Sequence, residues 1–239
     1  MKRALVTGGS GDIGSECARQ LAAAGCHVVV HASSRPERAE IVVGEIRSTG
    51  GSAEVLVADL SDGPATRAAL GELIAAGSIQ VLVHSAGIHS DAPLAGMSDE
   101  QWHQVIDVSL HGFFHVTQPL LLPMLRTRWG RVIAISSVAG QMGNRGQANY
   151  AAAKAGLHGA VLSLAKEVGT RGVTANVVAP GIIAGSMTEG LFDADRVKQM
   201  VPLGRMGTPA EVAAVVSFLA SDAASYVSGQ IIGVNGGMA

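Results

Sequence analysis

Aromatic side chains, cysteines and an excess of either charge are all lacking in this chain of 239 residues. Phe, Trp and Tyr make up only 3% of the sequence, which excludes a core built around large rings. The two cysteines, Cys17 and Cys26, are too few for a disulfide framework, and no Cys-x-x-Cys pair indicates a metal site. We therefore expect a reducing compartment, the cytoplasm, and no bound metal.

The charge balance and the hydrophobic runs exclude two further classes of protein. The 17 basic and 19 acidic residues nearly cancel, so there is no basic footprint for nucleic acid. The apolar stretch after Lys2 and Arg3 stops at Gly8, which is too short for a signal peptide or a membrane span. We expect a soluble protein with neither nucleic-acid nor membrane partners.

Apolar and small residues are abundant, and their arrangement predicts the fold. Short runs rich in Val, Ile, Leu and Ala are typical of strands covered on both faces. They occupy residues 4–7, 27–31, 53–58, 80–84, 131–136, 173–178 and 230–234, and helical segments start near Asp12, Pro36, Pro64, Asp99, Ala148 and Pro209. Asp99 and Thr208 stand where helix caps are expected. This alternation predicts one doubly wound, Rossmann-type α/β domain over residues 1–239 with a seven-stranded parallel sheet.

A glycine-rich turn follows the first expected strand. Residues 7–14 read Thr-Gly-Gly-Ser-Gly-Asp-Ile-Gly and lead into a helix. Such a turn lets backbone N–H groups approach a diphosphate at the helix N-terminus. A tight turn that needs positive φ angles is the simpler alternative. Its position at the first βα turn favours a nucleotide, because ligands bind outside the carboxyl ends of parallel strands.

The turn and a second motif together resemble the short-chain dehydrogenase/reductase family. Gly8 and Gly14 match the family's Thr-Gly-x-x-x-Gly-x-Gly pattern. Ser137 ends the fifth expected strand, and Tyr150 and Lys154 follow it on one face of a helix. With Pro180-Gly181 and Asn235-Gly236-Gly237, the resemblance covers essentially the whole chain. It implies an oxidoreductase that uses a nicotinamide dinucleotide.

The resemblance assigns the chemistry to Ser137, Tyr150 and Lys154. Reducing a ketone needs a hydride at carbon and a proton at oxygen, and a phenol with an ordinary pKa of about 10 is a suitable acid. We expect the Lys154 ammonium to lower the pKa of Tyr150 towards the working range. The resemblance also implies that Lys154 holds the nicotinamide ribose and that Ser137 hydrogen-bonds the substrate oxygen. Ser109, beside His111, stands where an asparagine usually helps to relay protons.

The residues after the second expected strand indicate which cofactor is used. An acidic side chain there would bind the ribose 2′-OH and favour NAD. Instead Ser33, Ser34 and Arg35 can donate hydrogen bonds to a 2′-phosphate, which favours NADP(H) over the alternative of a solvated loop arginine. The full cofactor site implied by the resemblance is Gly8, Ser10, Gly11, Asp12, Ile13, Gly14, Ser33, Ser34, Arg35, Asp59, Leu60, Ser85, Ala86, Gly87, Tyr150, Lys154, Pro180, Gly181 and Ile183.

Three of the cofactor-loop positions depart from the family's pattern. Asp12 replaces the middle glycine, and Ser85 lies where the family has an asparagine. Gly185 replaces a threonine that is usual near the nicotinamide carboxamide, and Ser186 or Thr188 is the expected substitute. These changes leave the loop geometry open.

The resemblance is closest to the branch that reduces 3-oxoacyl groups on acyl carrier protein, notably in Gly146–Tyr150. Two arginines near the site mouth dock the acidic carrier in that branch. Arg128 and Arg171 occupy the matching positions, with Arg126 and Arg131 close by. Ordinary solvated arginines are the alternative reading. The matched pair favours an acyl carrier protein as partner.

Two other functions and an oligomeric assembly also fit the sequence. The chain could act on 3-oxoacyl-CoA or another small ketone or alcohol, or be a non-catalytic NADP-binding protein, since fold does not fix function. The intact catalytic residues favour an enzyme. Residues 148–166 are small or apolar on nearly every face, which predicts a homo-oligomer, a tetramer by resemblance.

Overall fold

Seven short apolar segments form one parallel sheet in the computed structural model, which describes all 239 residues. The strands are β1 (Arg3–Thr7), β2 (His27–Ala32), β3 (Ser52–Val57), β4 (Val81–His84), β5 (Gly130–Ile135), β6 (Val173–Pro180) and β7 (Ile231–Val234). They pair in the order β3-β2-β1-β4-β5-β6-β7, every neighbour parallel. The expected fold class is confirmed, and each strand lies within two residues of its expected bounds.

Helices connect the strands and cover both faces of the sheet. They are α1 (Asp12–Ala23), α2 (Glu37–Ser48), α3 (Gly63–Ala75), α4 (Asp99–Ile106), α5 (Gly112–Arg126), α6 (Ala139–Met142), α7 (Ala148–Val168), α8 (Ala194–Met200) and α9 (Pro209–Ala220). A π-helical turn, Asp107–His111, joins α4 to α5. The six expected helix starts agree to within one residue. None of the helices has the length and apolar character needed to cross a membrane.

The helix caps confirm one expectation and correct another. Thr208 caps α9 by accepting a hydrogen bond from the Glu211 N–H, as expected. The cap of α4 is Ser98 rather than Asp99: its hydroxyl accepts from the Gln101 N–H, and the Gln101 side chain accepts from the Ser98 N–H. A serine followed three residues later by glutamine is a capping-box signal, and it was present in the sequence.

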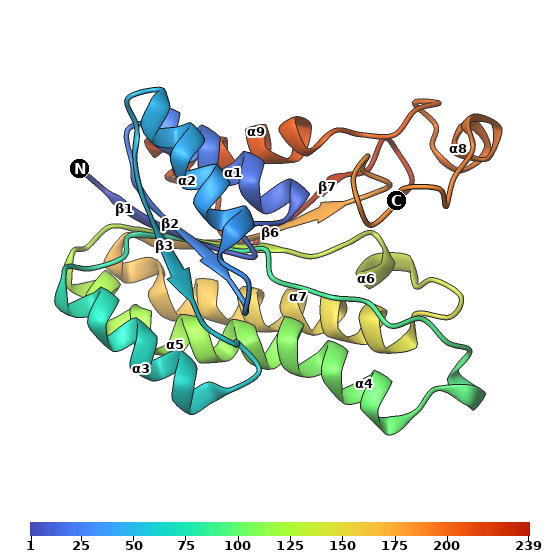
Figure 1. Cartoon of the computed structure of the whole chain (residues 1–239), viewed down its shortest axis with the longest axis horizontal. Helices are drawn as coiled ribbons and strands as arrows, with labels where there is room; N and C mark the ends of the chain where they lie inside the picture. Colours follow the sequence, from blue (N-terminus) through green and yellow to red (C-terminus); the bar gives the residue numbers. More distant parts are fainter.

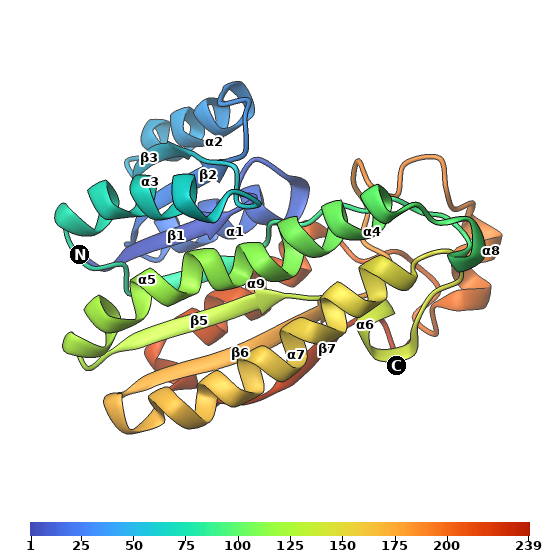
Figure 2. The same cartoon turned by 90° about the horizontal axis from the view of Figure 1, so that it is seen from below.

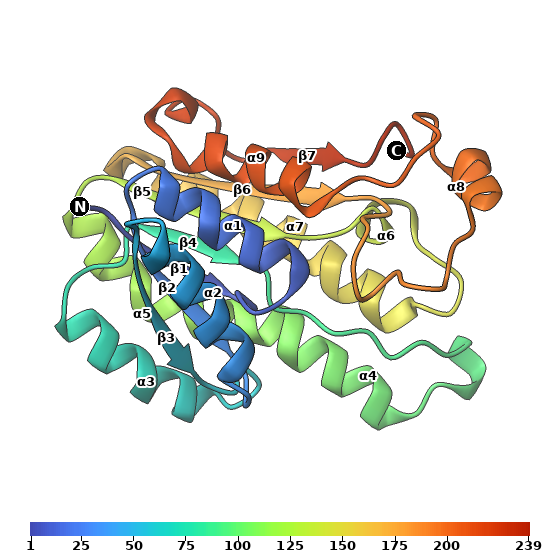
Figure 3. The ribbon, with the colours of Figure 1, turned by 45° about the horizontal axis from the view of Figure 1, so that its top comes forward.

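Successive side chains of each strand enter two separate cores. Ala4 and Val6 of β1 pack on the side of α1, α2 and α9, whereas Leu5 packs on the side of α3, α5 and α7. The two helix layers lie above and below the sheet in Figure 1, and Figure 3 shows α1, α2 and α9 across its upper face. Burial on both faces explains why the strands read as continuous apolar runs.

Candidate active site

The candidate active site lies at the edge of the sheet formed by the carboxyl ends of its parallel strands. β1 pairs with both β2 and β4, so the direction of strand winding changes between β1 and β4. Such a switch point opens a crevice at the sheet edge in doubly wound folds. The glycine turn follows β1, and the segment 85–87 follows β4, so these two loops form the walls of that crevice.

The glycine turn has the shape of a diphosphate cradle. Gly8 has a φ of 61°, and a Cβ added to it would lie 2.9 Å from the backbone nitrogen of Ala86. A Cβ on Gly14 would collide with the carbonyl oxygen of Gly8. The N–H groups of Asp12, Ile13 and Gly14 open α1 and donate to no backbone acceptor. These free donors, brought close by glycines, fit the phosphates of a dinucleotide.

Two buried histidines brace the cradle, and sequence analysis missed this role. His31 of β2 accepts a hydrogen bond from the Gly8 N–H at its Nδ1 (3.1 Å) and donates from Nε2 to the Ala58 carbonyl (2.8 Å). Burial lowers the pKa of His31, which keeps this arrangement neutral. His31 directly continues the valine run of β2, residues 28–30. A strand covered on both faces buries every side chain along it, so this position could have indicated a buried histidine.

His84 likewise connects neighbouring loops by hydrogen bonds at the end of β4. Thr7 Oγ1 accepts from the N–H groups of Ser85 and Ala86 (3.2 Å each) and therefore donates to His84 Nδ1 (3.0 Å). The His84 Nε2 donates to the Ser109 carbonyl oxygen (3.0 Å). Burial, followed by the charge of Lys154, lowers the pKa of His84 to about 3. A neutral histidine thus fastens β1 and β4 to the π-helical turn.

The loops after β2 and β3 present the residues expected to bind the adenosine half of a dinucleotide. Ser33, Ser34 and Arg35 are exposed, and no side-chain hydrogen bond or ion pair engages them. The Asp59 carboxylate accepts from the Ser61 N–H (3.0 Å) and hydroxyl (2.7 Å), and Leu60 beside it is buried. The loop after β2 therefore offers free donors and no carboxylate.

Ser137, Tyr150 and Lys154 meet where β5 ends against α7. The Lys154 ammonium is buried, donates to the Ile135 carbonyl (3.0 Å) and lies 5.5 Å from the centre of the Tyr150 ring. The Ser137 hydroxyl accepts from the Ala139 N–H (3.1 Å) and interacts with the Tyr150 phenol. The structure thus brings together the three residues that the motif spacing predicted.

In the chain without cofactor the pKa of Tyr150 is raised rather than lowered, which corrects the expected net shift. Burial raises the pKa of Tyr150, the hydrogen bond from Ser137 opposes this, and the charge of Asp91 raises it further. Burial also disfavours the charged form of Lys154, because it lowers the pKa of this residue from 10.5 to about 8. Tyr150 is therefore a protonated phenol at neutral pH, the form that a proton donor needs.

Ser109 lies beside Lys154 in the middle of the π-helical turn. A Cβ on Gly87 would lie 2.9 Å from Lys154 Nζ and 3.4 Å from Ser109 Oγ, so both groups face that glycine. The Ser109 hydroxyl is buried and has no hydrogen-bond partner. An unpaired buried hydroxyl next to the ammonium is suited to bind a water at the relay position.

The loop after β6 differs from the expectation for its hydroxyls. Ser186 donates its hydroxyl to Asp12 (2.7 Å), and Thr188 donates to the carbonyls of Ile183 (2.6 Å) and Gly185 (3.1 Å). Neither side chain is free to replace the missing threonine in this conformation. Each hydroxyl is already used to fix the loop.

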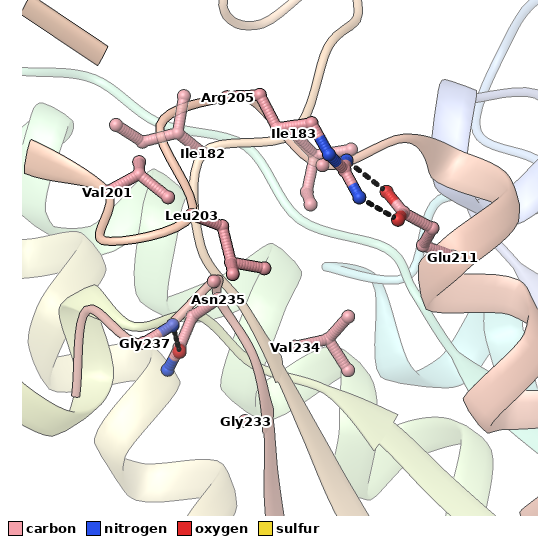
Figure 4. Close-up of a pocket in the computed structure, with 12 residues that line it drawn as sticks. Ile182, Ile183, Val201, Leu203, Arg205, Glu211, Gly233, Val234, Asn235 and Gly237 are labelled. Carbon is pink, nitrogen blue, oxygen red and sulfur yellow. Dashed lines mark hydrogen bonds and ion pairs between the residues drawn. The ribbon is translucent and has the colours of Figure 1, made fainter. Parts of the chain in front are cut away.

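A cavity of about 220 Å³ opens on the far side of the same loop. Figure 4 shows Ile182, Leu203 and Val234 around it, with the ion pair of Arg205 and Glu211 at one end. Ser137, Tyr150 and Lys154 do not line this cavity. We therefore do not assign it to the reacting centre. No three His, Cys, Asp or Glu side chains cluster so as to hold a metal.

Comparison with known proteins gives full-length matches. Residues 9–239 match the family model described as Enoyl-(Acyl carrier protein) reductase. The chain is 44% identical to the 3-oxoacyl-[acyl-carrier-protein] reductase FabG of Staphylococcus aureus, over 99% of this chain and 98% of that protein. It is 46% identical to the 3-oxoacyl-[acyl-carrier-protein] reductase of Synechocystis, over 98% of this chain and 96% of the relative.

Proposed function

The chain belongs to the short-chain dehydrogenase/reductase family, and from this premise we propose that it is an NADPH-dependent 3-oxoacyl-[acyl-carrier-protein] reductase of fatty-acid synthesis. The observation that carries the proposal is the meeting of Ser137, Tyr150 and Lys154 beside the glycine cradle. The family model's description names reduction of a C=C bond. The relatives that match over nearly their whole length are named for the C=O reaction, and a protonated phenol at Tyr150 suits protonation of oxygen.

Each residue around the substrate carbonyl has a separate role in the reduction. The reduced nicotinamide, when bound, supplies the hydride to the carbonyl carbon. Ser137 donates a hydrogen bond to the carbonyl oxygen, and Tyr150 gives it a proton as negative charge develops. Lys154 stabilises the tyrosinate left behind and holds the ribose. A water at Ser109 returns the proton to Tyr150.

The location of the protein is proposed to be the cytoplasm. Cys17 and Cys26 are buried free thiols, and they and a reducing cofactor both fit a reducing compartment.

The function is tested by following NADPH oxidation with matched substrates. We expect rapid turnover with a 3-oxoacyl group on acyl carrier protein, slower turnover with the same acyl group on CoA, and little with the corresponding enoyl thioester. Equal rates with carrier and CoA thioesters would favour a general 3-oxoacyl reductase. NADPH binding without turnover on any ketone would favour the non-catalytic alternative.

Arg35 is proposed to select NADP(H). The parent enzyme should use NADPH at least roughly tenfold more efficiently than NADH, as expected for one charge-assisted contact. Arg35→Ala should shrink this ratio about tenfold through the KM for NADPH, and Arg35→Lys should shrink it less. Lys166→Ala, which removes an exposed charge at the far end of α7, should leave the ratio unchanged. A parent enzyme equally efficient with both cofactors contradicts the assignment.

The proposed homotetramer rests on the exposed face of α7. Ala152, Ala155, Gly159 and Ser163 form an exposed stripe at helical spacing, and Phe114 and Leu122 of nearby α5 are 59% and 68% exposed. Small residues allow a second helix to approach closely, and exposed apolar side chains beside them favour contact with another subunit. Light scattering should therefore show a tetramer at micromolar concentration. Ala155→Arg should shift it to smaller species, whereas a parent protein that is already monomeric contradicts the proposal.

The expected carrier-docking arginines lie together, but at an unexpected edge of the sheet. Arg128 precedes β5 and Arg171 precedes β6, and a Cβ on Gly172 would touch the Arg128 carbonyl. Both therefore sit at the amino ends of these strands, whereas Ser137 follows the carboxyl end of β5. Figure 2 shows these two ends of β5 and β6 on opposite sides of the molecule. Strands of six to eight residues span about 20–25 Å. The arginines therefore do not line the mouth of their own chain's site, which corrects our expectation.

The neighbouring residues support docking at this edge. Arg126 and Arg171 line a groove with Leu122 and Leu125. Arg128 is the single non-glycine residue with positive φ, 51°, a conformation retained at some cost in free energy. Arg131 takes no part, because it is buried against Trp129 and the Ser221 carbonyl. We propose that Arg126, Arg128 and Arg171, the basic patch, deliver the carrier to the catalytic group of a neighbouring subunit.

Reversing the charge of the patch should separate carrier binding from chemistry. Arg128→Glu with Arg171→Glu should lower kcat/KM for carrier-linked substrate at least roughly tenfold. The protein as a whole is slightly acidic and would repel an acidic carrier, so the local basic patch must supply the attraction. A small free ketone should be reduced as before. The parent's carrier-dependent rate should fall as salt rises. Arg67→Glu, an exposed reversal on α3, is the control; equal loss with both substrates would remove the docking role.

Mixed oligomers test whether the patch serves another subunit. Subunits with Tyr150→Phe and subunits with both arginine reversals should each have reduced activity towards carrier-linked substrate. When they are unfolded and reassembled together, an intact patch faces an intact catalytic group at some interfaces, and activity should exceed the mean of the two variants. If patch and catalytic group work within one chain, the activity of the mixture equals that mean.

A further inference from the structure

Two departures from the family pattern meet in space although they are far apart in sequence. The Asp12 Oδ2, at the start of α1, accepts hydrogen bonds from the Ser186 N–H (2.6 Å) and hydroxyl (2.7 Å). Gly185 lies directly beneath this contact. A Cβ added to Gly185 would lie 2.5 Å from Asp12 Oδ2 and 2.9 Å from its Cγ.

In this geometry the two departures from the family pattern, Asp12 and Gly185, depend on each other. The threonine usual at position 185 cannot coexist with Asp12 as it is placed here, because its Cβ alone would overlap the carboxylate. Without Asp12, the donors of Ser186 would lose their acceptor. The contact of Asp12 with Ser186 thus requires glycine at position 185, and Gly185 lacks the hydroxyl that would otherwise reach the carboxamide.

The contact ties the loop after β6 to the glycine cradle after β1. The loop after β6 is anchored on its other side, where Ala184 N–H donates to the Gly207 carbonyl (2.9 Å) and Gly207 N–H to that of Ile182 (2.9 Å). Thr188 closes it into a turn. Asp12 holds the tip of this turn against the glycine cradle.

We propose that Asp12 and Ser186 form a latch that positions the loop over the nicotinamide end of the crevice, in place of the contact that the missing threonine would make with the cofactor. The loop is therefore held before the cofactor arrives. Asp12 is a positioning residue, with no part in hydride or proton transfer. The inference rests on the proposed NADP(H) site.

A four-protein cycle tests the latch: the parent, Asp12→Gly, Gly185→Thr and the double variant. Without cofactor, Asp12→Gly should speed hydrogen exchange of the Ser186 amide at least tenfold, because that N–H loses its acceptor. Gly185→Thr should raise the NADPH Kd at least tenfold in the parent background. The same change should cost less than threefold once Asp12→Gly is present, since the overlap is gone. Glu16→Gln, on the same helix without a contact to the loop, should change neither measurement.

The outcomes separate the latch from the proposed function. The latch is refuted if Ser186 exchange is unchanged in Asp12→Gly, or if Gly185→Thr is equally harmful with and without Asp12→Gly. If Gly185→Thr does not fold, Gly185→Ala carries the same steric test through its Cβ. A parent protein that does not bind NADPH sinks the cofactor proposal, while the exchange measurement on the protein alone still decides the latch.

Discussion

Tyr150→Phe lowers turnover by on the order of 10²- to 10⁴-fold, because it removes the proton donor and keeps the ring. The affinity for NADPH should stay within about threefold of the parent, measured by fluorescence titration. The chain has one other tyrosine, Tyr226, which is fully exposed. Tyr226→Phe is therefore a matched control and should be as active as the parent. Near-parental turnover of Tyr150→Phe would remove this residue from the mechanism.

The raised pKa of Tyr150 adds a pH signature to the same measurement. Burial favours the neutral phenol, which is the acid needed for reduction, so reduction should continue across neutral pH and decline only as pH rises through that raised pKa. Oxidation of the hydroxy product needs the phenolate as base and should speed up over the same rise. Tyr150→Phe should lose both trends. A reduction rate that rises with pH would show that another group donates the proton.

Lys154→Met should lower turnover by on the order of 10²-fold or more and, at the same time, stabilise the fold. Turnover falls because the ammonium that stabilises a developing tyrosinate is lost. Stability rises because burial lowers the pKa of Lys154 from 10.5 to about 8, which corresponds to about 3 kcal/mol against holding the charged form at pH 7. Methionine fills the same space without that cost.

The sign of this effect can be checked by pH. Between pH 8 and 10.5 the unfolded chain binds more protons at Lys154 than the folded chain, so the parent gains stability as pH rises through that window. The advantage of Lys154→Met in thermal unfolding should therefore shrink over the same window. Lys166→Met, an exposed lysine on the same helix, should alter neither turnover nor this pH dependence. Loss of both stability and activity in Lys154→Met would indicate a structural role only.

The strands and their order in sequence were predictable because burial on both faces leaves a local signature. Val28, Val29 and Val30 of β2 are all fully buried, two in one core and one in the other, so the run needs no knowledge of its neighbours. The same holds for the helix start at Thr208, whose hydroxyl accepts from the Glu211 N–H in the first turn of α9. The i, i+4 spacing of Tyr150 and Lys154 likewise depends only on helix geometry.

The sequence by itself therefore determined the fold class, the glycine turn after β1 and the candidate catalytic residues, all of which follow from neighbours along the chain. Only the tertiary structure decided the pKa of the candidate proton donor, the position of the basic patch and the contact between two loops. Burial by distant elements raises the pKa of Tyr150, against our expectation. Parallel strands place Arg128 and Arg171 at the edge away from the catalytic group. Asp12 and Gly185, two separate departures in sequence, become one contact because the loops after β1 and β6 meet at the same edge of the sheet.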